Sequence, residues 1–265
     1  MIRTLAHLSD LHLGRSPASD AEVAHAVDAL DGIDHVVVSG DVTHRGRADE
    51  HAKFERLFAP LAARGRLTVV PGNHDRLGDD LAARLRKGAR VQSHAAAGVF
   101  IVRVDSTGPH NRFLLAGHGD LCDGIVEDIE CAVAEAPPRH VVVVTLHHHL
   151  LPLPEETFPE LLATRVGLPY ANELRRGALL LERLRGRCDL VLHGHRHVPR
   201  ATTLYAGDAR PLGLYNAGST PSLGRFRVFA HAAGRLLGAP GWLVSRDRTC
   251  RAALVERRLT GTEDA

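Results

Sequence analysis

Five clusters of polar side chains that can bind metal ions stand out in the sequence, and each follows a short apolar run that predicts a β-strand. In chain order they are Asp10 and His12; Asp41; Asn73, His74 and Asp75; His147, His148 and His149; and His193, His195 and His197. Strand carboxyl ends in an open α/β sheet face one crevice, so clusters far apart along the chain would meet there. A single Asp-x-His or Asn-His pair is typical of an ordinary turn. The shared position at strand ends is what predicts a functional site.

The chemistry of this set is that of a site for two metal ions. Carboxylates and imidazoles, with one amide and no thiolate, suit Mn, Fe or Zn better than Cu(I) or an iron–sulfur cluster. The four cysteines have no CxxC spacing, which indicates ordinary small apolar residues. The set is too large for one tetrahedral ion and fits two ions that share a bridging carboxylate. Two ions about 3.5–4 Å apart can stabilise the attacking and leaving oxygens of an in-line displacement, the geometry of phosphoryl transfer.

The elements that must position these clusters alternate between strands and helices as far as Gly194, which predicts βαβ units. The expected strands are 2–9, 35–39, 67–70, 99–104, 141–146 and 189–192. The expected helices are 19–30, 48–63, 77–87, 124–135 and 172–184. After Gly194, β-like runs separated by Gly, Pro and Asp predict antiparallel strands at 202–205, 213–215, 226–230 and 242–245.

Composition indicates one large domain. The chain has 265 residues, of which 44% are apolar, and its net charge of +2 is too small to predict a polyanionic partner. We expect a single domain at 1–258 and a frayed tail at 259–265. The proline-rich stretch 150–171 is either a lid over the site or a surface connection. No leader peptide or membrane-spanning run is visible, which predicts a cytoplasmic protein without a membrane partner.

The motifs at the five clusters resemble those of the calcineurin-like metallophosphoesterase superfamily. They are DLH at 10–12, GDVTHRG at 40–46, GNHD at 72–75, the triple histidine at 147–149 and GHRH at 194–197. The resemblance implies a four-layer α/β/β/α sandwich around two mixed β-sheets. It implies a first ion held by Asp10, His12, Asp41 and His197, and a second held by Asp41, Asn73, His147 and His195. Such pairs usually contain Mn²⁺ or Fe, with Zn²⁺ or Ni²⁺ as alternatives.

The same resemblance implies a hydrolase in which a metal-bridging hydroxide attacks phosphorus in line with the leaving oxygen. His74 resembles the family's catalytic histidine, which would donate a proton to the leaving oxygen or hydrogen-bond a phosphate oxygen. Asp75 would orient the His74 ring, with a helix cap as the structural alternative. Asn216 resembles a segment that the family places near the site, and we expect it to be structural.

Several positions stay open at this point. The resemblance favours His147 among the three histidines, and strand alternation would turn His148 to the opposite face while His149 could line the pocket. His193 is expected on the face opposite the ligands or buried beneath them. Arg15, His44, Arg76 and His149 are candidate substrate contacts, although Arg15, His44 and Arg76 are each more typical of a solvated surface charge. Five arginines near Trp242 favour a polar surface over a nucleic-acid track, because Asp247 and Glu256 interrupt the charge.

These motifs specify a reaction centre rather than a substrate. The histidine run followed by prolines, HHHLLPLP, resembles the bacterial cyclic-nucleotide and glycerophosphodiester branch, which implies a phosphodiesterase acting on a small phosphoester. One alternative is a DNA or RNA nuclease of the same superfamily, which DLHLGR favours. Others are a phosphomonoesterase and a nucleotide pyrophosphatase. A metal-free scaffold protein is the non-enzyme alternative, which the presence of every proposed ligand disfavours.

Overall fold

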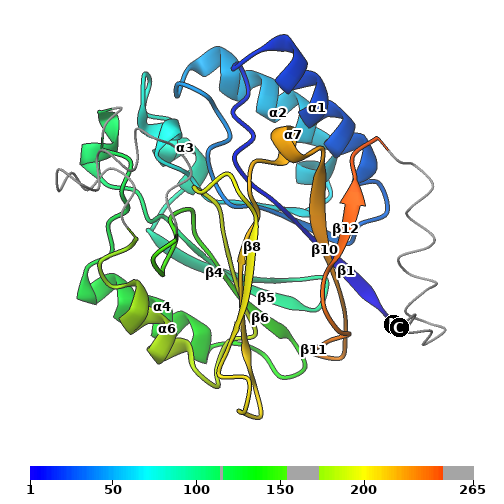
Figure 1. Ribbon diagram of the computed structural model, residues 1–265, viewed down its shortest axis with the longest axis vertical. Coiled ribbons are helices and arrows are strands. Elements are labelled where there is room, and N and C mark those ends of the chain that lie inside the picture. Colours follow the sequence, from blue (N-terminus) through cyan, green and yellow to red (C-terminus); the bar gives the residue numbers. More distant parts are fainter. Residues whose placement is uncertain (114–115, 154–172, 247–265) are drawn as a thin grey trace.

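Two six-stranded sheets pack face to face between two layers of helices in the computed structural model, which describes residues 1–113, 116–153 and 173–246 (Figure 1). The four-layer α/β/β/α sandwich expected from the sequence is therefore confirmed. Both sheets mix parallel and antiparallel strands, as expected.

The first sheet has the strand order β11-β10-β1-β2-β3, with β12 paired to β10. Its strands are β1 (Arg3–Leu8), β2 (His35–Val38), β3 (Leu67–Val69), β10 (Arg225–Ala232), β11 (Arg235–Leu236) and β12 (Gly241–Val244). Strands β1, β2 and β3 run parallel, with Leu5 opposite His35 and Val36 opposite Leu67. Their carboxyl ends, and the polar residues that follow, therefore meet at one edge of the sheet.

The second sheet has the strand order β4-β5-β6-β7-β9-β8. Its strands are β4 (Val91–Ala96), β5 (Val99–Val104), β6 (Val141–Thr145), β7 (Leu190–His193), β8 (Arg200–Leu204) and β9 (Leu212–Asn216). The four inner strands run parallel and the two edge strands are antiparallel. The sequence analysis missed β4, because this half-buried edge strand carries Gln92, Ser93 and His94 instead of an apolar run.

Helices cover the outer face of each sheet. Helices α1 (Pro17–Ala29) and α2 (Ala48–Ala63) cover the first sheet, and α4 (Asp123–Ala134) and α6 (Gly177–Leu184) cover the second (Figure 1). Helix α1 begins two residues before the expected start at residue 19, after Ser16, whose Oγ accepts the backbone N–H of Ser19. The short α7 (Thr220–Leu223) contacts α1 and β10.

The expected helix 77–87 is mostly wrong. Within this range only α3 (Ala82–Arg86) is helical, and the 3₁₀ segment η1 (His74–Arg76) precedes it. A second 3₁₀ segment, η2 (Pro109–Arg112), follows β5. Gly78 and Asp80 have φ values of 50° and 49°, which interrupt a right-handed helix between η1 and α3.

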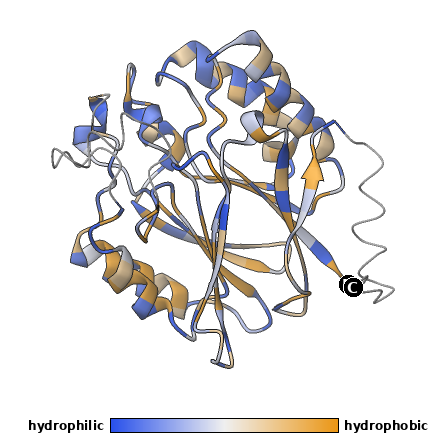
Figure 2. Ribbon diagram, in the orientation of Figure 1, coloured by the Kyte–Doolittle hydropathy of each residue, from blue (hydrophilic) through white to orange (hydrophobic). Residues whose placement is uncertain are grey.

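Side chains alternate between two apolar layers along the inner strands. On β6, Val141 and Val143 face the space between the sheets, whereas Val142 and Val144 pack against the α4–α6 layer. Because both faces of the sheet are covered at β6, its sequence is an uninterrupted apolar run. Figure 2 shows the corresponding apolar colouring of α4 and α6.

The predicted lid at 150–171 lies mostly outside the described residues, as do the tail at 259–265 and the arginines from Arg248 onward. The extent of the domain, 1–258, stays a prediction. Within the described part of the chain, no helix has both the length and the apolar character needed to cross a membrane.

Candidate metal centre

The predicted ligands lie in loops that follow β1, β2, β3, β6 and β7, and backbone hydrogen bonds join these loops. The N–H groups of Asp10 and His12 donate to the carbonyl oxygens of Gly40 and Asp41 at 3.1 and 3.0 Å. The N–H of His195 donates to Asp10 Oδ2 at 3.2 Å. Segments from both sheets are therefore held against one another at the carboxyl ends of their strands.

Four predicted ligands have a left-handed backbone, which non-glycine residues rarely adopt. The φ values are 51° for Asp10, 45° for His12, 50° for Asp41 and 71° for His195. Each such residue costs of order 1–3 kcal/mol and persists only where surrounding contacts enforce it. This concentration of backbone strain coincides with the residues selected from the sequence for their chemistry.

The first group of donors surrounds His12. Its Nε2 atom lies 3.2 Å from His197 Nε2, 4.0 Å from Asp10 Oδ1 and 3.9 Å from Asp41 Oδ2. His197 Nε2 lies 3.6 Å from Asp10 Oδ1. Ligand atoms bound about 2.0–2.2 Å from one ion are themselves roughly 3–4 Å apart, so this spacing fits one ion.

The second group of donors surrounds Asn73. Its Oδ1 atom lies 3.1 Å from His147 Nε2 and 3.0 Å from His195 Nδ1, and His147 Nε2 lies 3.4 Å from Asp41 Oδ2. His147 Nδ1 donates to the carbonyl oxygen of Ser39 at 2.8 Å, which leaves Nε2 as the nitrogen available to a metal. Asp41 Oδ2 therefore faces both groups.

The chemistry of these residues fits cations. Asp10 and Asp41 are buried, at 0% and 2% exposure, and Asp10 Oδ1 has no hydrogen-bond donor. Burial raises the pKa of Asp10 above its ordinary value. Burial alone would also raise the pKa of Asp41, but His147, His74 and His12 hold it well below. Two buried carboxylates this close together require compensating positive charge, and carboxylate, imidazole and amide donors suit divalent metal ions.

Two glycines allow the loops to approach these carboxylates. A methyl group on Gly72 would lie 2.8 Å from Asp41 Cγ and would overlap Asp41 Oδ1. A methyl group on Gly194 would lie 2.6 Å from Asp10 Oδ2 and would overlap Ser9 Oγ. Close backbone approach, rather than chain flexibility, is therefore what requires glycine at both positions.

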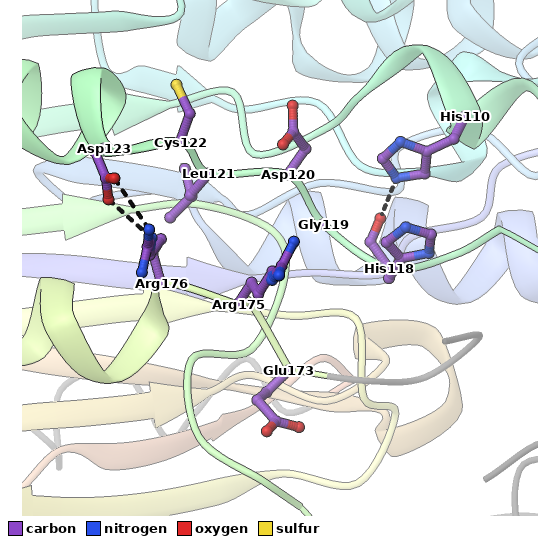
Figure 3. Close-up of a pocket in the computed structure, with 10 residues that line it drawn as sticks. All are labelled: His110, His118, Gly119, Asp120, Leu121, Cys122, Asp123, Glu173, Arg175 and Arg176. Atoms are coloured by element: carbon purple, nitrogen blue, oxygen red, sulfur yellow. Dashed lines mark hydrogen bonds and ion pairs between the residues drawn. The ribbon is translucent and has the colours of Figure 1, made fainter. Parts of the chain in front are cut away.

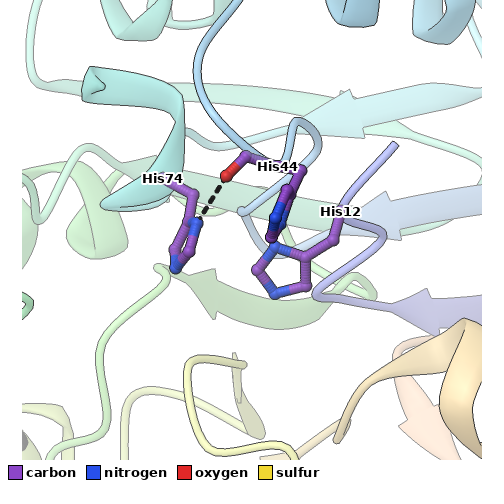
Figure 4. Close-up of side chains that lie close together, drawn as sticks. All are labelled: His12, His44 and His74. Atoms are coloured by element: carbon purple, nitrogen blue, oxygen red, sulfur yellow. Dashed lines mark hydrogen bonds between the residues drawn. The ribbon is translucent and has the colours of Figure 1, made fainter. Parts of the chain in front are cut away.

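The ring of His74 is oriented by a backbone carbonyl. Its Nδ1 donates to the carbonyl oxygen of His44 at 2.7 Å, so this hydrogen bond does not use Nε2 (Figure 4). The ring centroids of His74 and His12 are 4.6 Å apart. The backbone N–H of His74 donates to Asp41 Oδ1 at 2.8 Å. His74 therefore contacts the shared carboxylate through its backbone and the site through its ring.

Asp75 fixes a loop instead of the His74 ring, which corrects the expected contact. Its carboxylate accepts the backbone N–H groups of Gly72 and Thr43, both at 2.9 Å, and the Thr43 hydroxyl at 2.6 Å. These bonds tie the loop after β3 to the loop after β2. Burial and the neighbouring Asp41 raise the pKa of Asp75 to about 6, against the effect of these hydrogen bonds.

His148 lies on the same side as His147, so the alternation expected for a strand is wrong here. Strand β6 ends at Thr145, and the three histidines lie beyond it. The His148 ring is 5.0 Å from that of His147 and 4.9 Å from that of His195. His149 stacks on His195 at 5.5 Å, and its predicted substrate contact stays a prediction.

Ser106 is a site residue that the sequence analysis missed. Its Oγ lies 2.8 Å from His148 Nδ1 and accepts the backbone N–H groups of His147 and His148, both at 3.3 Å. It follows β5 just as the other clusters follow their strands. The same strand-end criterion could have found it, but serine is too common to mark a metal site.

The predicted substrate contacts differ in where they point. The His44 ring lies beside the site, 5.8 Å from the His12 ring and 5.9 Å from the His74 ring (Figure 4). Arg76 turns toward another loop, because its Nε donates to Thr107 Oγ1 at 2.7 Å. Arg15 is exposed next to the loop that carries His12.

Two residues support the loop of His195 and His197 from behind. Asn216 Nδ2 donates to the carbonyl oxygens of Arg196 and Val198 at 2.8 and 3.1 Å, which confirms its structural role. His193 is buried at 3% exposure, and its Nδ1 hydrogen-bonds the carbonyl oxygen of Gly194 at 3.2 Å.

A cavity of about 730 Å³ is lined by residues 118–123 together with His110, Glu173, Arg175 and Arg176 (Figure 3). Gly119 allows its wall to pack on His148, since a methyl group there would lie 2.6 Å from His148 Cγ. The lining carries both signs of charge, including an Arg176–Asp123 ion pair at 2.8 Å. This wall therefore gives the site no uniformly basic surface on that side.

Comparison with known proteins agrees with this geometry. A sequence model of the family described as calcineurin-like phosphoesterase matches residues 3–199. A "Probable cyclic nucleotide phosphodiesterase" of Rhodococcus erythropolis (strain PR4 / NBRC 100887) is 27% identical over 227 residues, covering 77% of this chain and 67% of the relative. The glycerophosphodiester phosphodiesterase GpdQ of Enterobacter lignolyticus (strain SCF1) is 32% identical over 174 residues, covering 56% of this chain and 58% of the relative.

Among solved structures, the chain is similar to purple acid phosphatase PPD1 from yellow lupin (Lupinus luteus). The TM-score is 0.64 at 13% identity, and the match covers 94% of this chain and 52% of that chain. At this identity the likeness supports the fold alone.

Proposed function

The chain belongs to the calcineurin-like phosphoesterase family and is a metal-dependent phosphoric ester hydrolase, and we propose that it is a phosphodiesterase whose site holds two metal ions. The observation that carries this proposal is the shared position of Asp41. Its Oδ2 lies 3.9 Å from His12 Nε2 on one side and 3.4 Å from His147 Nε2 on the other. A carboxylate that lies between two groups of metal-binding donors is suited to bridge two cations.

Each ion would have four protein ligands. The first set is Asp10, His12, Asp41 and His197, and the second set is Asp41, Asn73, His147 and His195. When bound, the two ions would polarise the phosphate and supply a water molecule of lowered pKa. We propose Mn²⁺ or Fe, with Zn²⁺ or Ni²⁺ as alternatives, because the donors are nitrogen and oxygen atoms without a thiolate.

His74 is the proposed proton donor. Its Nδ1 is engaged by the carbonyl oxygen of His44, so Nε2 can carry a proton to a leaving oxygen or hydrogen-bond the phosphate. A positioned acid of this kind typically contributes 10²–10⁴-fold to the rate. Asp75 would act indirectly, by holding together the loops that carry His74 and Asp41.

Differences in burial suggest how substrate approaches. Asp10, His12, Asp41 and His147 are buried, whereas 46% of the His197 side chain is exposed. Substrate would therefore enter from the side of His197; His44, whose ring lies 5.8 Å from that of His12, is also partly exposed. We propose His44 as a phosphate contact, with Arg15, His149 and Arg76 as further candidates.

The preference for a diester rests on the Rhodococcus and Enterobacter relatives, both of which are named as phosphodiesterases. The chain spans 67% and 58% of their lengths, so their substrates reach this chain only as a proposal.

Turnover of chromogenic esters after metal removal tests the proposal. We would dialyse the protein against a chelator and assay bis(p-nitrophenyl) phosphate and p-nitrophenyl phosphate, before and after adding Mn²⁺. We expect hydrolysis to require the added ion and the diester to have the higher kcat/KM. No recovery with Mn²⁺, Fe, Zn²⁺ or Ni²⁺ would overturn the metal-dependent mechanism. A higher kcat/KM for the monoester would overturn the diester assignment alone.

A further inference from the structure

A second cavity, of about 750 Å³, lies away from the metal centre. It is open to solvent and is lined by residues of α2, β3 and α3, by Lys87 just after α3, and by one residue of β5. None of its lining residues is a predicted metal ligand. Cavities of roughly 300–1,000 Å³ are typical of sites for small molecules, which favours a small ligand over a protein segment.

The floor of this cavity is apolar and aromatic. The Phe54 and Phe58 rings stack with centroids 4.6 Å apart, and Leu67 and Val69 of the edge strand β3 lie beside them. On α2, the lining residues Ala59 and Ala62 are small, which leaves the space above the floor open. An apolar body would therefore be removed from water here without displacing a large side chain.

The rim is cationic. Three cations, Arg84, Lys87 and Arg103, line the cavity, against one acid, Glu55. The Glu55 side chain is 68% exposed and lies 3.7 Å from His51 Nδ1.

The three cations are not equivalent. Arg103 Nη2 donates to the carbonyl oxygens of Leu85 and Arg86 at 2.8 and 2.5 Å, which fixes the end of α3. Within the described chain, the side chains of Arg84 and Lys87 make no hydrogen bond or ion pair. Two exposed cations therefore lie beside an apolar floor and are available to an anion.

We propose that this cavity binds a small amphiphilic anion, of the class of a medium-chain carboxylate. Its apolar chain would lie on Phe54 and Phe58, and its charged head would meet Arg84 and Lys87. An apolar floor with a few convergent charged groups is the usual composition of a small-molecule site.

Binding of decanoate to the full-length protein tests this site. Decanoate and the uncharged decanol would be titrated by displacement of 1-anilinonaphthalene-8-sulfonate fluorescence. We expect saturable binding, with decanoate at least tenfold tighter than decanol. The double variant Arg84→Glu/Lys87→Glu should weaken decanoate at least tenfold and leave decanol unchanged. Ala62→Trp should weaken both ligands, because the indole would fill the cavity.

Two comparisons keep these outcomes decisive. Arg56→Glu makes one such charge reversal on an exposed part of α2 that does not line the cavity, and it should bind decanoate like the wild type. Each variant should keep its metal-dependent ester hydrolysis, which shows that it is folded. Equal affinity for decanoate and decanol, or unchanged binding in Ala62→Trp, would overturn the proposal. So would an absence of saturable binding in the wild type.

Discussion

Replacing Gly72 with alanine should disable the metal centre although every ligand residue is kept. The new methyl group would lie 2.8 Å from Asp41 Cγ, whereas non-bonded carbon atoms keep about 3.5–4.0 Å apart. The Asp41 carboxylate would have to retreat by about 0.7–1.2 Å, and metal–ligand distances tolerate only about 0.2 Å. A misplacement of about 1 Å costs roughly 100-fold in rate. We therefore expect Gly72→Ala to lower kcat/KM at least 100-fold and to reduce the bound metal.

The measurement pairs elemental analysis with hydrolysis of bis(p-nitrophenyl) phosphate. Gly124→Ala is the matched control, because no atom lies within 4 Å of a methyl group at that position in α4. The control should keep full activity and become more stable by up to about 1 kcal/mol, as expected for alanine in a helix. If Gly72→Ala keeps the metal content and turnover of the wild type, Asp41 does not occupy the tight position described here.

Three further variants test separate parts of the structure. His74→Ala should keep its metal and lose about 10²–10⁴-fold in kcat; loss of metal would make His74 a ligand instead. Ser106→Ala should lower the free energy of unfolding in urea by about 1–3 kcal/mol, because it leaves buried groups of His147 and His148 without a partner. His35 is buried. Burial is the main cause that lowers its pKa from 6.5 to about 4, and the nearby charges of His94 and Arg66 add to the effect. Below pH 6.5 the unfolded chain binds a proton at His35 that the folded protein does not bind until about pH 4. The free energy of unfolding should therefore be highest above pH 6.5 and fall by up to about 3 kcal/mol as the pH approaches 4. His35→Gln should flatten that part of the unfolding profile, and an unchanged profile would contradict this.

The sequence predicted the parallel strands and the convergence of ligands well, because both depend on one repeated pattern. Each apolar run that is buried on both faces ends in a loop that carries polar side chains. Strand β4 escaped prediction because an edge strand need not be apolar, and Gln92 to His94 are half-buried.

Local geometry at the site was harder to predict. The orientation of His148 depends on where β6 ends, and a strand boundary cannot be located to one residue from the apolar run VVVVTL. The partner of the His74 ring is a backbone carbonyl, which no side-chain motif can reveal. The positive φ values of Asp10, His12 and Asp41 likewise depend on hydrogen bonds between loops distant in sequence.

The number of metal ions per chain tests the central claim most directly. Elemental analysis would count the metal ions per chain in the wild-type protein and in Asp41→Ala, both loaded with metal in the same way. We predict two ions per chain in the wild type and neither retained in Asp41→Ala, because both donor sets include that carboxylate. One ion per chain in the wild type, or two ions retained without the Asp41 carboxylate, would contradict the shared site.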